Sequence, residues 1–180
     1  MDEKVISNAF ANKKKAYLSD KMIQLINKQI QLEFNAGQLY KAMSTWCEYT
    51  GWEGIAKFMK RHINDERSHM EKLYSYALDR QVNPITPAVI SQPTSFKDLK
   101  DILERSLAHE ELIENSYKEA VKIALSENDH TSYQFLLWYL SEQVEEIALM
   151  SKWLDRLNIV GCDQKGMFFI DQEILESLDE

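Results

Sequence analysis

Proline is confined to one short window of this chain, and this constrains the fold more than any other feature. The three prolines are Pro84, Pro87 and Pro93, and only five glycines occur in 180 residues. Because proline removes a backbone donor and clashes with the preceding helical turn, helices end at such windows. Long helices can therefore form on both sides of residues 81–94, which we expect to be a connection.

Apolar side chains recur at helical spacing in four long segments outside this window. The segments cover residues 20–48, 51–80, 96–126 and 130–158. Ser19 is a good cap for the first helix, and Thr50 with Glu53 has the form of a capping box for the second. A short amphipathic piece, Phe169 to Leu178, predicts a fifth helix, and residues 1–18 form an N-terminal extension without clear structure.

The joints between the helices predict how the helices are arranged. Short turns join the first helix to the second and the third to the fourth, so each pair is antiparallel. Each helix would be about 45 Å long at 1.5 Å per residue. The connection of about 15 residues between the second and third helices reaches roughly 50 Å when extended, which spans that length. The sequence therefore predicts an all-α domain over residues 19–180, a four-helix bundle with one long crossover and a short fifth C-terminal helix.

Charge and cysteine content exclude several classes of protein. The net charge is −8 and the only basic cluster is Lys13-Lys14-Lys15, so no nucleic-acid-binding face is expected. No segment approaches the roughly 18 apolar residues of a membrane span, and the chain start lacks the apolar run of a signal peptide. Cys47 and Cys162 have no zinc-type spacing and are interpreted as free thiols in a reducing compartment. We therefore expect a cytoplasmic protein without membrane or nucleic-acid partners.

Each apolar stripe is interrupted by polar residues near the middle of its helix. Aligned helices bring their midpoints to one level, so four carboxylates, a histidine and a glutamine would meet in the core. An uncompensated carboxylate there costs about several kcal/mol, and a bound cation is the natural counter-charge. Carboxylate oxygens with an imidazole suit iron or manganese. The residues are Glu33, Glu66, His69, Glu110, Gln143 and Glu146.

The segment Glu66-Arg-Ser-His69 is a Glu-x-x-His motif, which puts both side chains on one helix face. Such a motif alone is more often two exposed polar residues. Its combination with Glu33, Glu110 and Glu146 favours a metal site. His62 and His109 are interpreted as structural neighbours of that site.

Local motifs around these residues are similar to those of one family. They are Gln31-Leu-Glu33 with Leu39-Tyr40, Arg61-His62 with Asp65-Glu66-Arg-Ser-His69, His109-Glu110, and Phe135-Leu-Leu-Trp-Tyr139-Leu-Ser-Glu142-Gln143-Val-Glu145-Glu146. The tail Gly166-Met-Phe-Phe-Ile170-Asp171 is similar to the start of that family's fifth helix. From residue 17 to residue 180, the chain resembles the bacterial non-haem ferritins.

This resemblance implies a role for each matching residue at a di-iron centre. Glu33, Glu66 and His69 would hold the first iron, and Glu66 would bridge to the second. Glu110 and Gln143 would serve that second iron.

The resemblance also implies roles for residues next to this pair of irons. Glu146 would lie beside both irons, and Tyr40 would hydrogen-bond the cluster or supply an electron; the alternative for Tyr40 is a packed core aromatic. A third iron site would use Asp65, Glu142 and Glu145, where Asp65 is one methylene shorter than the usual glutamate. The alternative for these three is an ordinary acidic face.

The function implied by the resemblance is iron storage. Such a ferritin is a ferroxidase that oxidises Fe(II) with O2 or H2O2 at a di-iron centre within each subunit. It deposits ferric mineral inside a homo-oligomeric, 24-subunit cage. Haem is not expected, because Gln143-x-x-Glu146 stands where the haem-containing bacterioferritins carry a second Glu-x-x-His.

Two other classes of protein stay open at this point. A non-storage di-iron oxidase or peroxidase of the rubrerythrin type would share the core ligands, but it normally adds a CxxC…CxxC iron domain, which this chain lacks. A DNA-protecting mini-ferritin has its site between subunits and no fifth helix. Assembly size and the iron bound per chain distinguish these classes.

Overall fold

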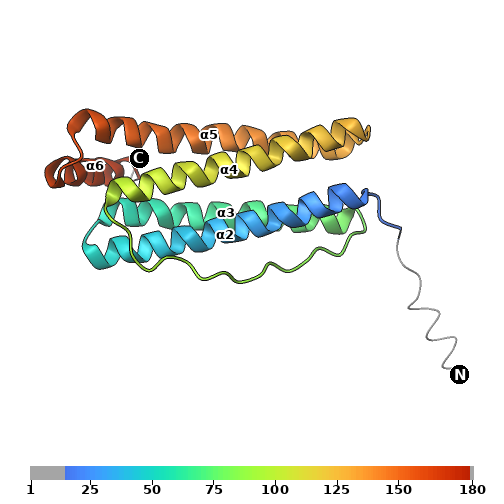
Figure 1. Cartoon of the computed structure of the whole chain (residues 1–180), viewed down its shortest axis with the longest axis horizontal. Helices are drawn as coiled ribbons and strands as arrows, with labels where there is room; N and C mark the ends of the chain where they lie inside the picture. Colours follow the sequence, from blue (N-terminus) through green and yellow to red (C-terminus); the bar gives the residue numbers. More distant parts are fainter. Residues whose placement is uncertain (1–14, 179–180) are drawn as a thin grey trace, which may run out of the picture.

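A computed structural model describes residues 15–178, and all regular structure in that range is helical (Figure 1). The elements are α2 (Asp20–Thr50), α3 (Glu53–Asp79), α4 (Leu99–Ser126), α5 (His130–Val160) and α6 (Gln164–Ser177). The four long helices begin and end within three residues of the predicted limits. The prediction of an all-α bundle with a short C-terminal helix is confirmed.

Local capping explains where most of these helices begin and end. Four helices begin after a residue whose side-chain oxygen accepts a hydrogen bond from a backbone N–H in the first turn. These capping residues are Ser19, Asp98, Asp129 and Asp163. At the other ends, Gly51 has φ 89° and Gly161 has φ 104°, a left-handed range that costs a side-chain-bearing residue energy. These signals are all local in sequence.

The start of α3 is different, and the predicted capping box there is wrong. Thr50 still belongs to α2, where its hydroxyl donates to the backbone oxygen of Trp46 at 2.8 Å. The residue before α3 is Trp52, which makes no side-chain cap. Instead, the backbone N–H of Ile55 donates to Asp171 Oδ1 at 2.9 Å. A buried carboxylate on α6 therefore satisfies a free donor at the start of α3.

The long helices form two antiparallel pairs joined by the predicted crossover. The helix α2 packs against α3 and α4, and α5 packs against α4. In Figure 1 the connection between α3 and α4 runs along the bundle from one end to the other. Its backbone is fixed on the outer side of α2, since Ile85 N–H donates to Asn27 and Ala88 N–H donates to Gln31, both at 2.8 Å. This crossover makes α4 start at the end of the bundle where α2 finishes.

The fifth helix begins five residues earlier than predicted, at Gln164 rather than Phe169. The turn from α5 is tight, because a Cβ at Gly166 would lie 1.9 Å from the backbone oxygen of Gly161. Only glycine allows this approach, so the helix can start directly after its Asp163 cap. The helix α6 then packs on α3 and α5 at one end of the bundle.

The end of the predicted N-terminal extension contacts the bundle. Leu18 is buried, and the backbone N–H of Tyr17 donates to the oxygen of Arg80 at 3.0 Å. Residues 1–14 of that extension lie outside the described residues. Across residues 15–178, no helix is long and apolar enough to cross a membrane.

Candidate metal centre

Five of the predicted site residues meet in the middle of the bundle. They come from all four long helices and are at most 5% exposed: Glu33 on α2, Glu66 and His69 on α3, Glu110 on α4, and Gln143 on α5. Each replaces an apolar side chain on the inner stripe of its helix. These side chains therefore lie at one level along the bundle, as the similar lengths of the helices predicted.

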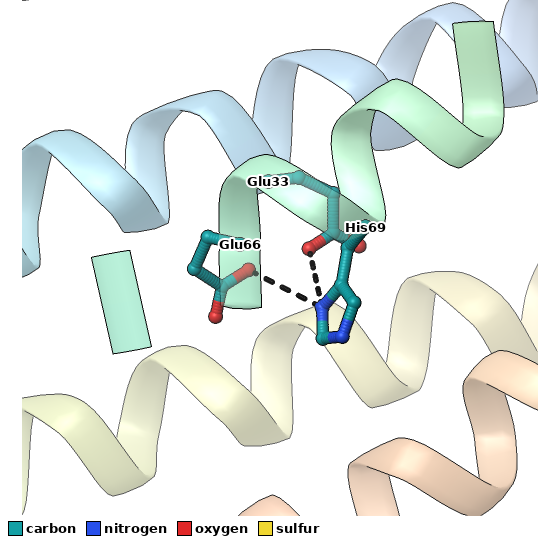
Figure 2. A group of neighbouring side chains, drawn as sticks. All are labelled: Glu33, Glu66 and His69. Carbon is teal, nitrogen blue, oxygen red and sulfur yellow. Dashed lines mark ion pairs between the residues drawn. The ribbon is translucent and has the colours of Figure 1, made fainter. Parts of the chain in front are cut away.

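Glu33, Glu66 and His69 form the tightest part of this group (Figure 2). The Nδ1 atom of His69 lies 3.6 Å from Glu33 Oε2 and 3.7 Å from Glu66 Oε2. All three of these atoms are buried and have no hydrogen-bond partner. A buried unsatisfied polar atom costs about 1–3 kcal/mol, so three atoms converging on one point favour a bound cation.

Glu110 and Gln143 form the second part, on the opposite pair of helices. The amide of Gln143 donates to Glu110 Oε2 at 2.7 Å, and the Tyr40 hydroxyl donates to the other carboxylate oxygen. Tyr40 is fully buried on α2. The predicted hydrogen bond between Tyr40 and the cluster is therefore present, and it fixes the carboxylate of Glu110.

Tyr117 is a neighbour of the site that the sequence pattern did not single out. Its hydroxyl donates to Glu33, and its ring stacks on Tyr139 with 4.5 Å between centroids. The hydroxyl of Tyr139 in turn donates to the backbone oxygen of His69 at 2.9 Å. The available signal was that Tyr117 follows Glu110 by two helical turns on the same inner stripe.

Burial favours the protonated form of two of these carboxyl groups. Burial raises the pKa of Glu66 well above its ordinary range, and the charges of Glu33 and Glu110 raise it further. Burial also raises the pKa of Glu110, to about 7, although hydrogen bonds from Tyr40 and Gln143 act in the opposite direction. Both groups therefore tend to hold a proton when no cation neutralises them.

Glu33 and His69 behave in the opposite way. Burial acts to raise the pKa of Glu33, but interactions with the adjacent His69 and Glu66 side chains outweigh it and the pKa falls below its ordinary value. Burial acts to lower the pKa of His69, but the interaction with Glu33 reverses this and the pKa rises. Below about pH 7 the metal-free site thus tends to hold one charged pair beside two protonated carboxyls, and a dication would displace those protons.

The remaining acidic residues lie next to this site. Glu142 Oε2 lies 3.9 Å from Nε2 of His69, at the edge of the main site. Asp65 and Glu145 instead line a pocket together with Glu146. Within residues 15–178, two groups of three metal-ligating residues have donor atoms within 4.8 Å of one another: Glu33 with Glu66 and His69, and His62 with Asp65 and Glu146. The ligand roles assigned from the sequence stay predictions.

Comparison with known proteins decides the family. A family model described as a ferritin-like domain matches residues 23–160. A Haemophilus influenzae protein named "Probable bacterial non-heme ferritin-like protein" is 39% identical over 157 residues, which cover 87% of this chain and 95% of that protein. The "Bacterial non-heme ferritin" of Escherichia coli O6:H1 is 36% identical over 162 residues, covering 90% of this chain and 98% of that protein. This chain belongs to the bacterial non-haem ferritins.

The bundle of this ferritin also matches solved structures of the family. An open pore ferritin from the archaeon Archaeoglobus fulgidus superposes with a TM-score of 0.84 at 28% identity, over 88% of this chain and 98% of that one. The four long helices and the crossover of this chain are thus those of a ferritin subunit.

Proposed function

We propose that this ferritin oxidises Fe(II) at a di-iron centre within each subunit and stores the ferric product inside a protein cage. The observation that carries the proposal is the convergence of buried, unpartnered atoms from Glu33, Glu66 and His69. Without a cation these buried, unpaired atoms decrease the stability of the fold, and with one they can act as its ligands. The names of the related proteins support the same function.

In this proposal the ligands divide between two irons as the resemblance to the family implies. Glu33 and His69 hold the first Fe(II), and Glu66, whose oxygen lies 3.7 Å from His69 Nδ1, bridges toward the second. Glu110 holds the second iron, with Gln143 beside it at 2.7 Å. Two irons per chain is therefore the number that the buried ligands support.

The reaction needs two electrons at one place. Each Fe(II) loses one electron, and dioxygen takes both with two protons to give hydrogen peroxide. Where hydrogen peroxide is the oxidant, it takes two electrons and two protons to give two waters. A pair of irons avoids one-electron reduction of the oxidant. The hydroxyls of Tyr40 and Tyr117 donate to one carboxylate on each side of the site, so they keep Glu110 and Glu33 oriented during the reaction.

Storage requires a closed assembly, and we propose the 24-subunit cage. Several large apolar side chains are more than half exposed in the single chain, and they are available for contacts between subunits: Ile85, Val89, Ile90, Phe168 and Phe169. Cys47 and the exposed Cys162 are both free, which suits the reducing cytoplasm as the place of action.

The test is aerobic Fe(II) loading of the full chain, followed by size-exclusion chromatography with iron counted per chain. We expect a large assembly that carries far more iron than its ligands could coordinate directly. If uptake stops at about two irons per chain, the protein does not store iron, and a di-iron oxidase of the rubrerythrin type becomes the better interpretation. No retained iron would overturn the proposal.

Two glutamates on α3 provide a matched pair of variants for this test. Glu66→Gln removes the proposed bridging ligand but keeps the buried shape. Glu71→Gln makes the same chemical change on the exposed face of the same helix. We expect Glu66→Gln to oxidise and load iron slowly and Glu71→Gln to behave as the unmodified protein. Equal iron loading by both variants would show that Glu66 is not an iron ligand.

A further inference from the structure

A lysine side chain covers the face of an indole next to the proposed di-iron centre. The ammonium nitrogen of Lys72 lies 2.9 Å from the centre of the Trp138 ring and 5.8 Å from that of Tyr139. Lys72 belongs to α3 and Trp138 to α5, so this contact joins the two helices. Trp138 in turn meets the ring of His69 edge-on, with 5.6 Å between centroids. A positive charge and an aromatic ring therefore lie beside a ligand of the proposed iron site.

The aromatic rings, and not an acidic partner, hold the ammonium of Lys72 in place. Across residues 15–178, Lys72 makes no hydrogen bond and no salt bridge. Burial lowers the pKa of Lys72, and the charge of Glu142 acts in the opposite direction. A cation over a ring face is attracted by the negative charge of the π system, most strongly when the ring is tryptophan. The indole of Trp138 thus determines where the lysine charge lies.

Trp138 is one end of a chain of aromatic rings that contact each other inside the bundle. Its ring lies 4.8 Å from that of Tyr139, and Tyr139 stacks on Tyr117 with 4.5 Å between centroids. The hydroxyl of Tyr117 donates to Glu33, and that of Tyr139 donates to the backbone oxygen of His69. Aromatic rings in contact pass electrons readily. An electron demanded at the iron site can therefore be taken from this chain of rings.

Loss of an electron from the indole competes with the two-electron reaction of a pair of irons. In a subunit that holds a single Fe(II), hydrogen peroxide can take one electron from the iron and the second from Trp138. With two protons from solvent, the products are two waters, Fe(III) and an indole radical cation. Indole is among the most easily oxidised protein side chains, and its radical reacts further to oxidised tryptophan. Any feature that makes this electron harder to remove therefore protects the protein.

A positive charge over the ring acts on this step in one direction. It is attracted to the neutral ring, and it repels the radical cation that remains after an electron is lost. At 2.9 Å, a unit charge changes the equilibrium for electron loss by about tenfold even at the dielectric constant of water. We propose that Lys72 is a positioning residue that raises the reduction potential of Trp138 and protects this indole from one-electron oxidation. The benefit to iron chemistry rests on the function proposed above, whereas the effect on the indole does not.

The test uses the metal-free, full-length assembly and the carbonate radical, which takes one electron from an indole and becomes carbonate. Oxidised tryptophan at each position is then measured by peptide mass spectrometry. Methionine has a similar length to lysine and still covers the ring, so Lys72→Met removes the charge alone. We expect Lys72→Met to increase the oxidation of Trp138 several-fold, and Lys72→Arg to behave as the unmodified protein. Assembly size and circular dichroism check that each variant is folded.

A second lysine on α5 provides a matched control. The ammonium of Lys152 lies 4.7 Å from the ring centre of Trp153, so Lys152→Met removes a charge from a different indole. This variant should leave the oxidation of Trp138 unchanged. Equal oxidation of Trp138 in Lys72→Met and in the unmodified protein would refute the proposal. So would a Lys72→Arg variant as sensitive as Lys72→Met, because the charge would then not be what protects the ring.

A second assay tests the protective role during iron chemistry. The assembly receives one Fe(II) per chain and then hydrogen peroxide, and we again expect more oxidised Trp138 in Lys72→Met than in the unmodified protein. Equal oxidation of Trp138 here, with the difference still present in the metal-free assay, would overturn the protective role at the iron site. Failure of every variant to oxidise Fe(II) would instead overturn the proposed function, and the metal-free result would still stand.

Discussion

The carboxyl of Glu110 should make the stability of the metal-free ferritin decrease as pH rises, and a Glu110→Gln variant isolates this effect. The ordinary pKa of the group is 4.5, and burial raises it to about 7 in the folded chain. Below both values the carboxyl is protonated in both states and contributes nothing. As pH rises between them, the unfolded chain releases the proton first, so unfolding becomes more favourable.

The size of the effect follows from the shift. A pKa difference between 4.5 and about 7 corresponds to about 3 kcal/mol of stability lost above pH 7. Between pH 5 and pH 8 the loss is about 2–3 kcal/mol, because a small part has already occurred at pH 5. For a chain of this length, that change equals a decrease in Tm of roughly 5–10 °C. Glutamine cannot ionise, so the variant lacks this decrease.

The assay is guanidinium or thermal unfolding of both proteins with a chelator, at pH 5 and pH 8 and at one protein concentration, because assembly also stabilises the fold. The glutamine also rearranges the hydrogen bonds to Tyr40 and Gln143, but that cost does not depend on pH. The change of the variant's effect with pH therefore reports the ionisation alone. If Glu110→Gln alters stability equally at both pH values, the reasoning about this buried carboxyl is wrong.

Three further predictions test the site and the packing around it. Glu33→Gln should slow Fe(II) oxidation, measured by stopped-flow absorbance, by more than roughly tenfold to hundredfold, which is the typical effect of altering a residue that only supports a metal ligand. A smaller effect would argue against Glu33 as a ligand of the first iron. Tyr117→Phe leaves an oxygen of Glu33 without its donor and should destabilise the metal-free chain by about 1–3 kcal/mol in guanidinium unfolding, whereas no change would make that hydrogen bond irrelevant. Gly54→Ala would put a Cβ 1.8 Å from the backbone oxygen of Asp171 and should release α6, seen as faster hydrogen exchange there. In Gly37→Ala the added Cβ meets only an ordinary contact at 3.6 Å, so its stability should stay equal or rise by up to about 1 kcal/mol; equal behaviour of the two glycine variants would contradict the packing argument.

The candidate site was largely predictable because its residues obey one simple rule. Glu33, Glu66 and Glu110 each interrupt an apolar stripe near the middle of a helix, and helices of similar length share a midpoint level. The surroundings of His62 were not predictable in this way. His62 also lies on an inner stripe, but its unpaired nitrogens are visible only once Phe58 and Glu146 surround it.

The fifth helix and the start of α3 mark where local signals failed. Thr50 and Glu53 had the spacing of a capping box, but α2 extends through Thr50 and uses its hydroxyl. The donor on Ile55 is satisfied by Asp171, 116 residues away in sequence. No rule based on neighbouring residues could pair these two groups.

Helix periods, capping residues and the positions of prolines depend on interactions within a few residues, and these were readable directly from the chain. They were enough for the all-α bundle, the crossover and the level at which the carboxylates meet. The protonation of Glu66 and Glu110 depends instead on burial and on charges from other helices. Likewise, the position of Glu142 Oε2 at 3.9 Å from His69 Nε2 is set by how α3 and α5 pack. Such contacts join segments far apart in sequence, so they exist only after the helices have packed.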